Sequence, residues 1–241
     1  MTLKPVMMYM NIEIGNEDVS LLQMSDSFFP TGLYATSSGL EALSQVKKLK
    51  SKDILHYIST YLKQVVGPSD CAALGNAYES CMKKDLAALL NVDRSLYSMR
   101  LIEATRSASV RSGSQLLKCV STFVKDKKML KDYQKAVSNG NATGIYPVSL
   151  GVASWSLDIS KNKAGLILLY GFTVSVIGAA LRLGILQHYD GQKIIHELRP
   201  VILKSVLDNI DRSISNIWQF APGFDILQMK HEAMSSKMFI T

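Results

Sequence analysis

Residues 164–181 read AGLILLYGFTVSVIGAAL, a run without a charged side chain. A segment this long and apolar must leave water, either in a membrane or in the centre of a folded domain. Gly171, Ser175, Gly178 and Arg182 recur on it at helical spacing, a stripe that lets a second helix approach closely in either setting. Because the rest of the chain is amphipathic, we predict a central core helix, with a membrane span as the alternative.

The other apolar residues also recur with a helical period. Between Ser51 and Val66, for example, Ile54, Ile58 and Leu62 fall on one helical face. No alternating pattern persists long enough to build a sheet, no repeat has a fixed period, and no linker separates two blocks of different composition. The sequence predicts an all-α fold, a single-domain helical bundle of about ten helices over residues 1–241.

Glycine, proline and capping residues predict where these helices begin and end. Asp18 is expected to cap a short first helix. Gly67 in the sequence GPSD is expected to stop a helix that starts at Ser51 or Asp53, with Ser69 or Asp70 capping the next one.

Further boundaries follow in the second half of the chain. Asp93 is expected to begin a long helix over 95–124, in which Gly113 and neighbouring serines indicate a tight helix crossing. Pro147 is expected in the first turn of a helix, where proline is tolerated. Asp190 is expected to cap a helix that Pro200 either kinks or divides.

The charge balance gives few functional clues. Lys and Arg total 27 against 20 Asp and Glu, a net charge of +7 that favours acidic partners. The densest basic clusters, 47–52 and 125–131, lie at expected helix ends, where they complement the helix dipole. A nucleic-acid binder would rest on the net charge alone, so we predict no nucleic-acid partner.

Cysteine usage and the N-terminal sequence favour the cytoplasm. Cys71, Cys81 and Cys119 are odd in number and widely spaced, which fits neither a disulfide framework nor a zinc site. The stretch MTLKPVMMYMNIEIG lacks the continuous apolar region of a signal peptide. We therefore expect reduced thiols and a cytoplasmic protein.

No motif predicts catalysis. The sequence contains no HExxH, GxSxG, GxxxxGK[ST] or GxGxxG, so we expect no enzyme. The pairs His188 with Asp190 and His231 with Glu232 could contribute nickel, zinc or copper ligands. Two-residue pairs are weak metal candidates, and Asp190 fits a helix cap better. We therefore predict no stably bound cofactor or metal.

Both ends of the chain are richer in aromatic residues and methionine than free tails are. Such side chains adapt well to partner surfaces, and residues 1–20 and 222–241 are predicted to be adaptable segments. The stretch DSFFPTGLYATSSGLE, residues 26–41, carries its own turn residues. Pro30, Gly32 and Gly39 are predicted to bend the chain and to place three aromatic residues on one surface: Phe28, Phe29 and Tyr34.

Four blocks of this sequence resemble the family of urease accessory proteins called UreF. They are SDSFFPTGLYATSSGLE at 25–41, EATRSASVRSGSQLL at 103–117, YPVSLGVASWSL with ALRLGILQHYDGQ at 146–192, and FDILQMKHEAMSSKMF at 224–239. Their order covers the chain from about residue 20 onward. The chain departs from the family pattern at Thr36, where His or Tyr is common, at 185–189, and at Lys237, where Arg is usual and offers a planar fork.

The resemblance implies an all-α, dimeric, non-catalytic chaperone. Proteins of this family bind UreD (also called UreH), recruit and regulate the GTPase UreG, and support nickel delivery to apo-urease. The nickel is thus expected to be handled by the complex rather than held by this chain. The alternative is a metallochaperone that binds nickel directly through His188, Asp190, His231 and Glu232.

Two groups of residues are predicted to serve this function. The partner-binding group is Phe28, Phe29, Pro30, Tyr34, Glu41, Met229, His231, Glu232, Lys237 and Phe239. The second group comprises Gly32 and Gly39, which permit backbone geometry, and Arg182, Asp190 and Gln192, expected to face the core near a dimer contact or a polar passage.

Overall fold

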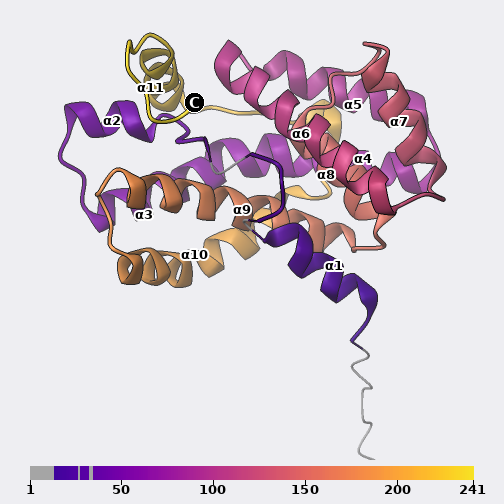
Figure 1. Cartoon of the computed structure of the whole chain (residues 1–241), viewed down its shortest axis with the longest axis horizontal. Coiled ribbons are helices and arrows are strands. Elements are labelled where there is room, and N and C mark those ends of the chain that lie inside the picture. The colour runs from indigo at the N-terminus through magenta and orange to yellow at the C-terminus, as the bar shows by residue number, and fades with distance from the viewer. Residues whose placement is uncertain (1–13, 27, 33–34) are drawn as a thin grey trace, which may run out of the picture.

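The computed structural model describes residues 14–26, 28–32 and 35–241, which form helices and no strand (Figure 1). The predicted all-α fold is confirmed, with one hydrophobic core running through the bundle. The elements are α1 Asn16–Ser25, α2 Leu40–Val46, α3 Ser51–Tyr61, the π-helix η2 Leu62–Cys71, α4 Ala72–Met82, α5 Leu86–Met99, α6 Glu103–Phe123, α7 Lys128–Ser138, α8 Tyr146–Ser156, α9 Lys161–Arg182, α10 His188–Asn209, the 3-10 helix η3 Ile214–Asn216 and α11 Pro222–Glu232.

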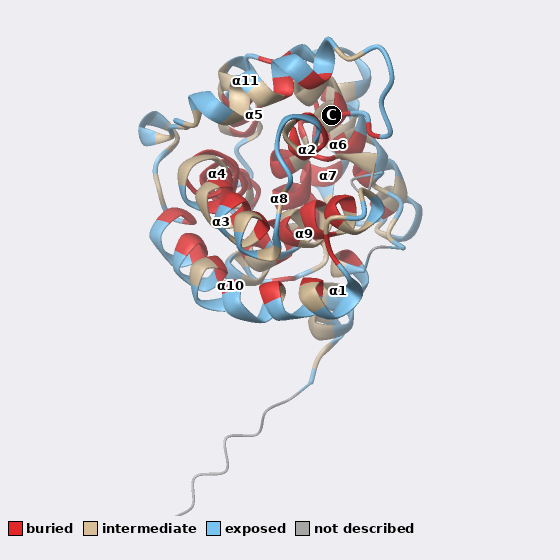
Figure 2. Cartoon of the chain, turned by 90° about the vertical axis from the view of Figure 1, so that its left-hand side faces the viewer, coloured by how far each residue is buried: buried red, intermediate tan, exposed pale blue. Residues whose placement is uncertain are grey.

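The apolar run forms α9, which lies at the centre of the bundle. It packs against α10, α8 and α1, and Figure 2 shows buried residues on α9 and on the helices around it. Among the described residues α9 alone is long and apolar enough to cross a membrane, and 56% of that window is buried inside the fold. Packing within the bundle therefore explains the missing charges, as the prediction of a core helix requires.

The small-residue stripe of α9 does not make the predicted close helix crossing. A Cβ built at Gly171 or Gly178 meets no described atom within 4 Å, and the stripe faces the segment 24–32 instead. The close approach occurs on another face of the helix. There a Cβ at Gly165 would lie 2.9 Å from Val206 of α10.

The predicted helix break at GPSD is wrong. The chain stays helical from α3 through the π-helix η2 into α4, with Pro68 inside the π-helix. The wider turn of a π-helix changes the backbone hydrogen-bond pattern and accommodates a proline, which has no N–H to donate. Gly67 does not end a helix but lets α10 approach closely. A Cβ added at this position would lie 2.9 Å from Asn209 Nδ2 of α10. Ser69 and Asp70, the predicted caps, are buried within η2.

Asp93 does not begin a helix, and residues 95–124 do not form one. Asp93 lies inside α5 with 1% of its surface exposed, and α6 begins only at Glu103. Its carboxylate accepts hydrogen bonds from the Tyr133 hydroxyl and from the backbone N–H groups of Thr143, Gly144 and Ile145. The residue thus fixes a loop that lies fifty residues away in sequence rather than capping its own helix.

Two predicted caps act from a different position. The N-caps of α1 and α10 are Gly15 and Gln187. Asp18 and Asp190 occupy the third helical position, and their carboxylates accept from these N-cap N–H groups at 3.1 Å and 3.4 Å. α10 continues unbroken through Pro200.

The predicted first-turn proline of α8 is confirmed. The helix α11 lies in a segment in which the sequence shows no clear helical period.

The predicted tight crossing at Gly113 is confirmed. This glycine of α6 packs on the start of α8, and an added Cβ would overlap the Gly144 carbonyl oxygen and lie 2.8 Å from Ser149 Oγ. We expect Gly113→Ala to lower the free energy of unfolding by about 3 kcal/mol, because backbone atoms must move to admit the methyl group. Urea unfolding measures this, with Gly223→Ala as the control, where no described atom lies within 4 Å of the new Cβ. Equal stability of the two variants would contradict the prediction.

Candidate functional site

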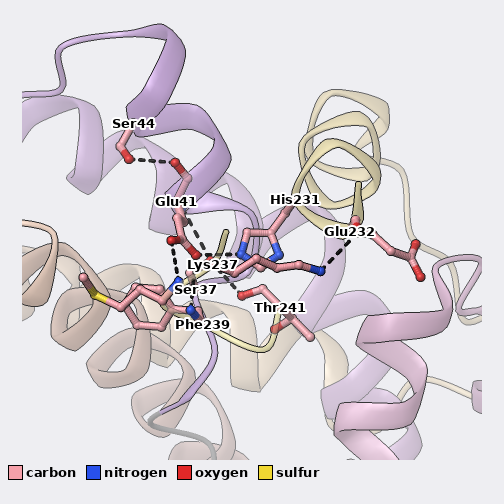
Figure 3. A network of polar contacts seen from close by, with 9 residues as sticks. Ser37, Glu41, Ser44, His231, Glu232, Lys237, Phe239 and Thr241 are labelled. Carbon is pink, nitrogen blue, oxygen red and sulfur yellow. Dashed lines mark hydrogen bonds and ion pairs between the residues drawn. The ribbon is translucent and has the colours of Figure 1, made fainter. Parts of the chain in front are cut away.

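The carboxylate of Glu41, in the first turn of α2, is buried beneath the C-terminal segment (Figure 3). Its Oε2 lies 2.7 Å from His231 Nε2 of α11 and accepts the Phe239 N–H at 3.2 Å, while Oε1 accepts the Met238 N–H at 2.8 Å. An ionised carboxylate only accepts hydrogen bonds, so Nε2 carries the hydrogen. We call these four residues the Glu41 network.

Ionisation of Glu41 is favoured despite its burial. Burial raises the pKa of the carboxyl, but the hydrogen bonds from Met238, His231 and Phe239 outweigh that effect and hold the pKa below its usual value. The network is therefore built around a negative charge at neutral pH, and each of its donors points at that charge.

A second contact joins the C-terminal segment to the residues that precede α2. The Ile240 N–H donates to the Ala35 carbonyl at 2.9 Å, and the Ser37 N–H and hydroxyl both donate to the Thr241 backbone oxygen, at 2.6 Å and 2.7 Å. Phe239 between these contacts is buried, with the Arg182 guanidinium 4.4 Å from its ring centroid. Residues 35–41 and 237–241 thus form one folded unit.

Two glycines shape the turn that brings these segments together. Gly32 and Gly39 adopt φ of 76° and 88°, a region that favours glycine, which agrees with their predicted geometric role. A Cβ at Gly39 would lie 3.2 Å from Leu227 of α11, so the absence of a side chain also lets α11 approach α2. The Tyr57 hydroxyl of α3 fixes the same turn by donating to the Ser38 carbonyl at 2.6 Å.

Aromatic and amide side chains dock α11 on α3. Phe224 stacks on the ring of Tyr61, with centroids 4.4 Å apart, and meets Tyr57 edge-on. The buried amide of Gln228 donates to the Tyr61 hydroxyl and accepts from Thr105 of α6 at 2.8 Å. The helix that carries His231 is therefore held on α3 and α6 as well as by Glu41.

The sequence of this chain matches known proteins over most of its length. The UreF family model matches residues 50–199. The chain is 35% identical over 93% of its length to the urease accessory protein UreF of Trichodesmium erythraeum (strain IMS101), covering 97% of that protein. The chain belongs to the UreF family. It is also 31% identical to urease accessory protein UreF 1 of Brucella melitensis (91% of each chain) and 27% identical to UreF of Bacillus sp. (strain TB-90), with 94% of this chain and all of that protein covered.

In this member of the UreF family the residues of the predicted aromatic surface differ in burial. Phe28 is 91% exposed, whereas Phe29 packs partly buried against the core. Pro30 is exposed. Tyr34 lies outside the described residues, so a shared surface of the three aromatic side chains stays a prediction.

The other predicted partner residues divide by burial. Glu41, His231 and Phe239 are buried inside the chain, while Met229, Glu232 and Lys237 are exposed. The exposed group covers the outer side of the segment that the buried group holds in place. Contact of any of these residues with a partner stays a prediction.

The residues expected to face the core near a dimer contact or polar passage lie at the surface. Arg182 and Gln192 are exposed and Asp190 is half-buried, so their prediction as core-facing is wrong. Arg182 extends from the last turn of α9 over Phe239, and Asp190 caps α10. Both residues thus lie at helix ends rather than in the core.

No group of three or more potential metal ligands of the His, Cys, Asp and Glu types forms within the described residues. His188 and Asp190 lie at the start of α10, and His231 is already engaged by Glu41. A chain that binds nickel directly through these residues is therefore not favoured.

Sequence reasoning missed a cavity of about 110 Å³ whose lining is mainly apolar. Its polar lining residues include the ion pair of Asp70 and Arg100, 2.6 Å apart, together with Tyr61, Thr105 and Gln228. Burial raises the pKa of Asp70, and the adjacent guanidinium opposes this rise. Asp70 and Arg100 are thirty residues apart, so no local pattern signals their pairing.

Proposed function

We propose that this chain is a non-catalytic scaffold of urease maturation that acts in the cytoplasm as a homodimer. It binds UreD, recruits the GTPase UreG and regulates GTP hydrolysis, and the assembly delivers nickel to apo-urease. Membership of the UreF family supports a place in urease maturation. In this proposal nickel is the cargo of the assembly.

The surface formed by residues 35–41 and 237–241, which the Glu41 network joins, carries this proposal. Two segments far apart in sequence, the residues before α2 and the residues after α11, are joined by a buried carboxylate and backbone hydrogen bonds. Large apolar side chains remain exposed beside them, including Phe28 at 91%, Met229 at 59% and Met238 at 61%. Exposed aromatic residues and methionines next to a fixed backbone are suited to protein recognition.

An apolar groove supports the proposed homodimer. It is lined mainly by leucine and isoleucine side chains of α1, α9 and α10 and has a volume of about 700 Å³. Leu22 and Leu203 at its rim are 71% and 51% exposed. A second copy of the chain would remove this surface from water, which is favourable at roughly 25 cal/mol per Å² of apolar area.

Reconstitution with purified partners tests the proposal. We expect the chain to co-purify with UreD encoded in the same genome, and the pair to retain UreG in the presence of GTP. Light scattering should give a mass that contains two copies of this chain. A chain that lacks residues 237–241 but keeps α11 should no longer co-purify with UreD. Absence of UreD binding by the complete chain would contradict the scaffold function.

A further inference from the structure

A second groove, of about 670 Å³, lies between α6 and the turn that precedes α2. One wall is the α6 face that carries Arg111, Gln115 and Lys118, and the other wall comes from the turn residues 30–32. Ile240 of the C-terminal segment also lines it. The groove is thus bounded by the same two segments that the Glu41 network joins.

The charges in this groove are all of one sign. Arg111 and Lys118 are exposed, and neither has an ion-pair partner in the described part of the chain. The lining contains no acidic residue. Arg106 on the same helix differs, because it pairs with Glu103 and lies over the ring of Tyr97. Arg111 and Lys118 therefore present two positive charges without intramolecular neutralisation.

The spacing of the two cations defines what they fit. Seven residues of α-helix correspond to two turns and about 10 Å, on the same side of α6. A peptide in the extended polyproline II conformation rises about 3.1 Å per residue with three residues per turn, so carboxylates three residues apart lie on one face of it, about 9 Å from each other, and match that distance. Pro30, Val110 and Ile240 add apolar surface to the same groove, and Ile240 is 49% exposed.

We propose that this groove binds an extended acidic segment of a partner protein, with two carboxylates on Arg111 and Lys118 and an apolar side chain against Pro30 and Ile240. The inference rests on the proposed scaffold function, since it assigns one contact surface within that assembly. The backbone bond from Ile240 to Ala35 and the Glu41 network hold the Ile240 wall in place.

Charge reversal in the groove tests the inference. The test variant is Arg111→Glu/Lys118→Glu. The matched control is Lys125→Glu/Lys128→Glu, which makes the same charge change at exposed positions outside the groove lining. Affinity for purified UreD and for purified UreG is measured by biolayer interferometry at about 50 mM and about 300 mM salt, since salt screens exposed charges.

We expect the test variant to bind one of these partners at least about tenfold more weakly than the wild-type chain at low salt, and the control less than about threefold. Salt should weaken the wild-type complex more than that of the variant. Arg111→Gln/Lys118→Gln should give an intermediate loss, and circular dichroism spectra should be unchanged because both positions are exposed.

The possible failures are distinguishable. A wild-type chain that binds UreD or UreG, together with a test variant that binds equally well or loses no more than the control, overturns the groove and leaves the scaffold function intact. A wild-type chain that binds neither partner overturns both proposals. Binding of a labelled single-stranded oligonucleotide that the test variant alone loses assigns the groove to nucleic acid and also overturns the inference.

Discussion

Replacement of Asp93 by alanine is expected to lower the free energy of unfolding by about 4 kcal/mol. The Asp93 side chain is buried, and four donors point at it: the Tyr133 hydroxyl at 2.6 Å and the N–H groups of Thr143, Gly144 and Ile145 at 2.6, 3.1 and 3.2 Å. Alanine leaves these donors without their acceptor, and three of the four hydrogen bonds are buried, with only that of Thr143 partly buried. Urea unfolding followed by circular dichroism measures the loss.

Two variants separate the carboxylate from its neighbours. Tyr133→Phe removes one donor and leaves the three backbone bonds, so we expect a loss of about 1 kcal/mol. Asp93→Asn keeps one acceptor oxygen and should lie between Tyr133→Phe and Asp93→Ala. If Asp93→Ala were no less stable than Tyr133→Phe, the backbone bonds to the loop 143–145 would contribute nothing, and the assigned role of Asp93 would be wrong.

Local signals in the sequence predicted the helices, whereas contacts between distant residues decided where several of them end. Ser51 begins α3 and Pro147 lies in the first turn of α8 as predicted, because both signals act within one helical turn. The local signals at Gly67 and Asp93 predict the wrong helix ends because the roles of both residues depend on tertiary neighbours. Gly67 makes room for Asn209, and Asp93 receives donors from a loop fifty residues away.

The same distinction applies to the candidate site. The positive φ of Gly32 and Gly39 follows from a turn-rich sequence, and Glu41 and His231 are both predicted to bind a partner. That Glu41 pairs with His231 of the same chain, 190 residues away, is a property of the fold and has no local signal. Both residues are predicted to contact a partner protein, but in the fold they are buried and contact each other.

Replacement of Glu41 by alanine is expected to release the C-terminal segment and to weaken UreD binding at least about tenfold. The N–H groups of Met238 and Phe239 and the ring of His231 lose their shared acceptor. Ordering a released backbone costs about 1–2 kcal/mol per residue, and UreD binding would then have to offset that cost for residues 237–241. Hydrogen exchange should show faster exchange of the Phe239 and Ile240 amides, and biolayer interferometry with UreD measures the affinity.

The pattern among three further variants decides whether Glu41 acts through this network. His231→Ala leaves the carboxylate with its two backbone donors, so it should loosen the segment less than Glu41→Ala does. The double variant should resemble Glu41→Ala alone, because residues of one network are not additive. Glu197→Ala removes one exposed charge on α10 and should change neither amide exchange nor affinity. Slow exchange at Phe239 and unchanged UreD affinity in Glu41→Ala would show that the aromatic contacts of α11 hold the segment without the carboxylate.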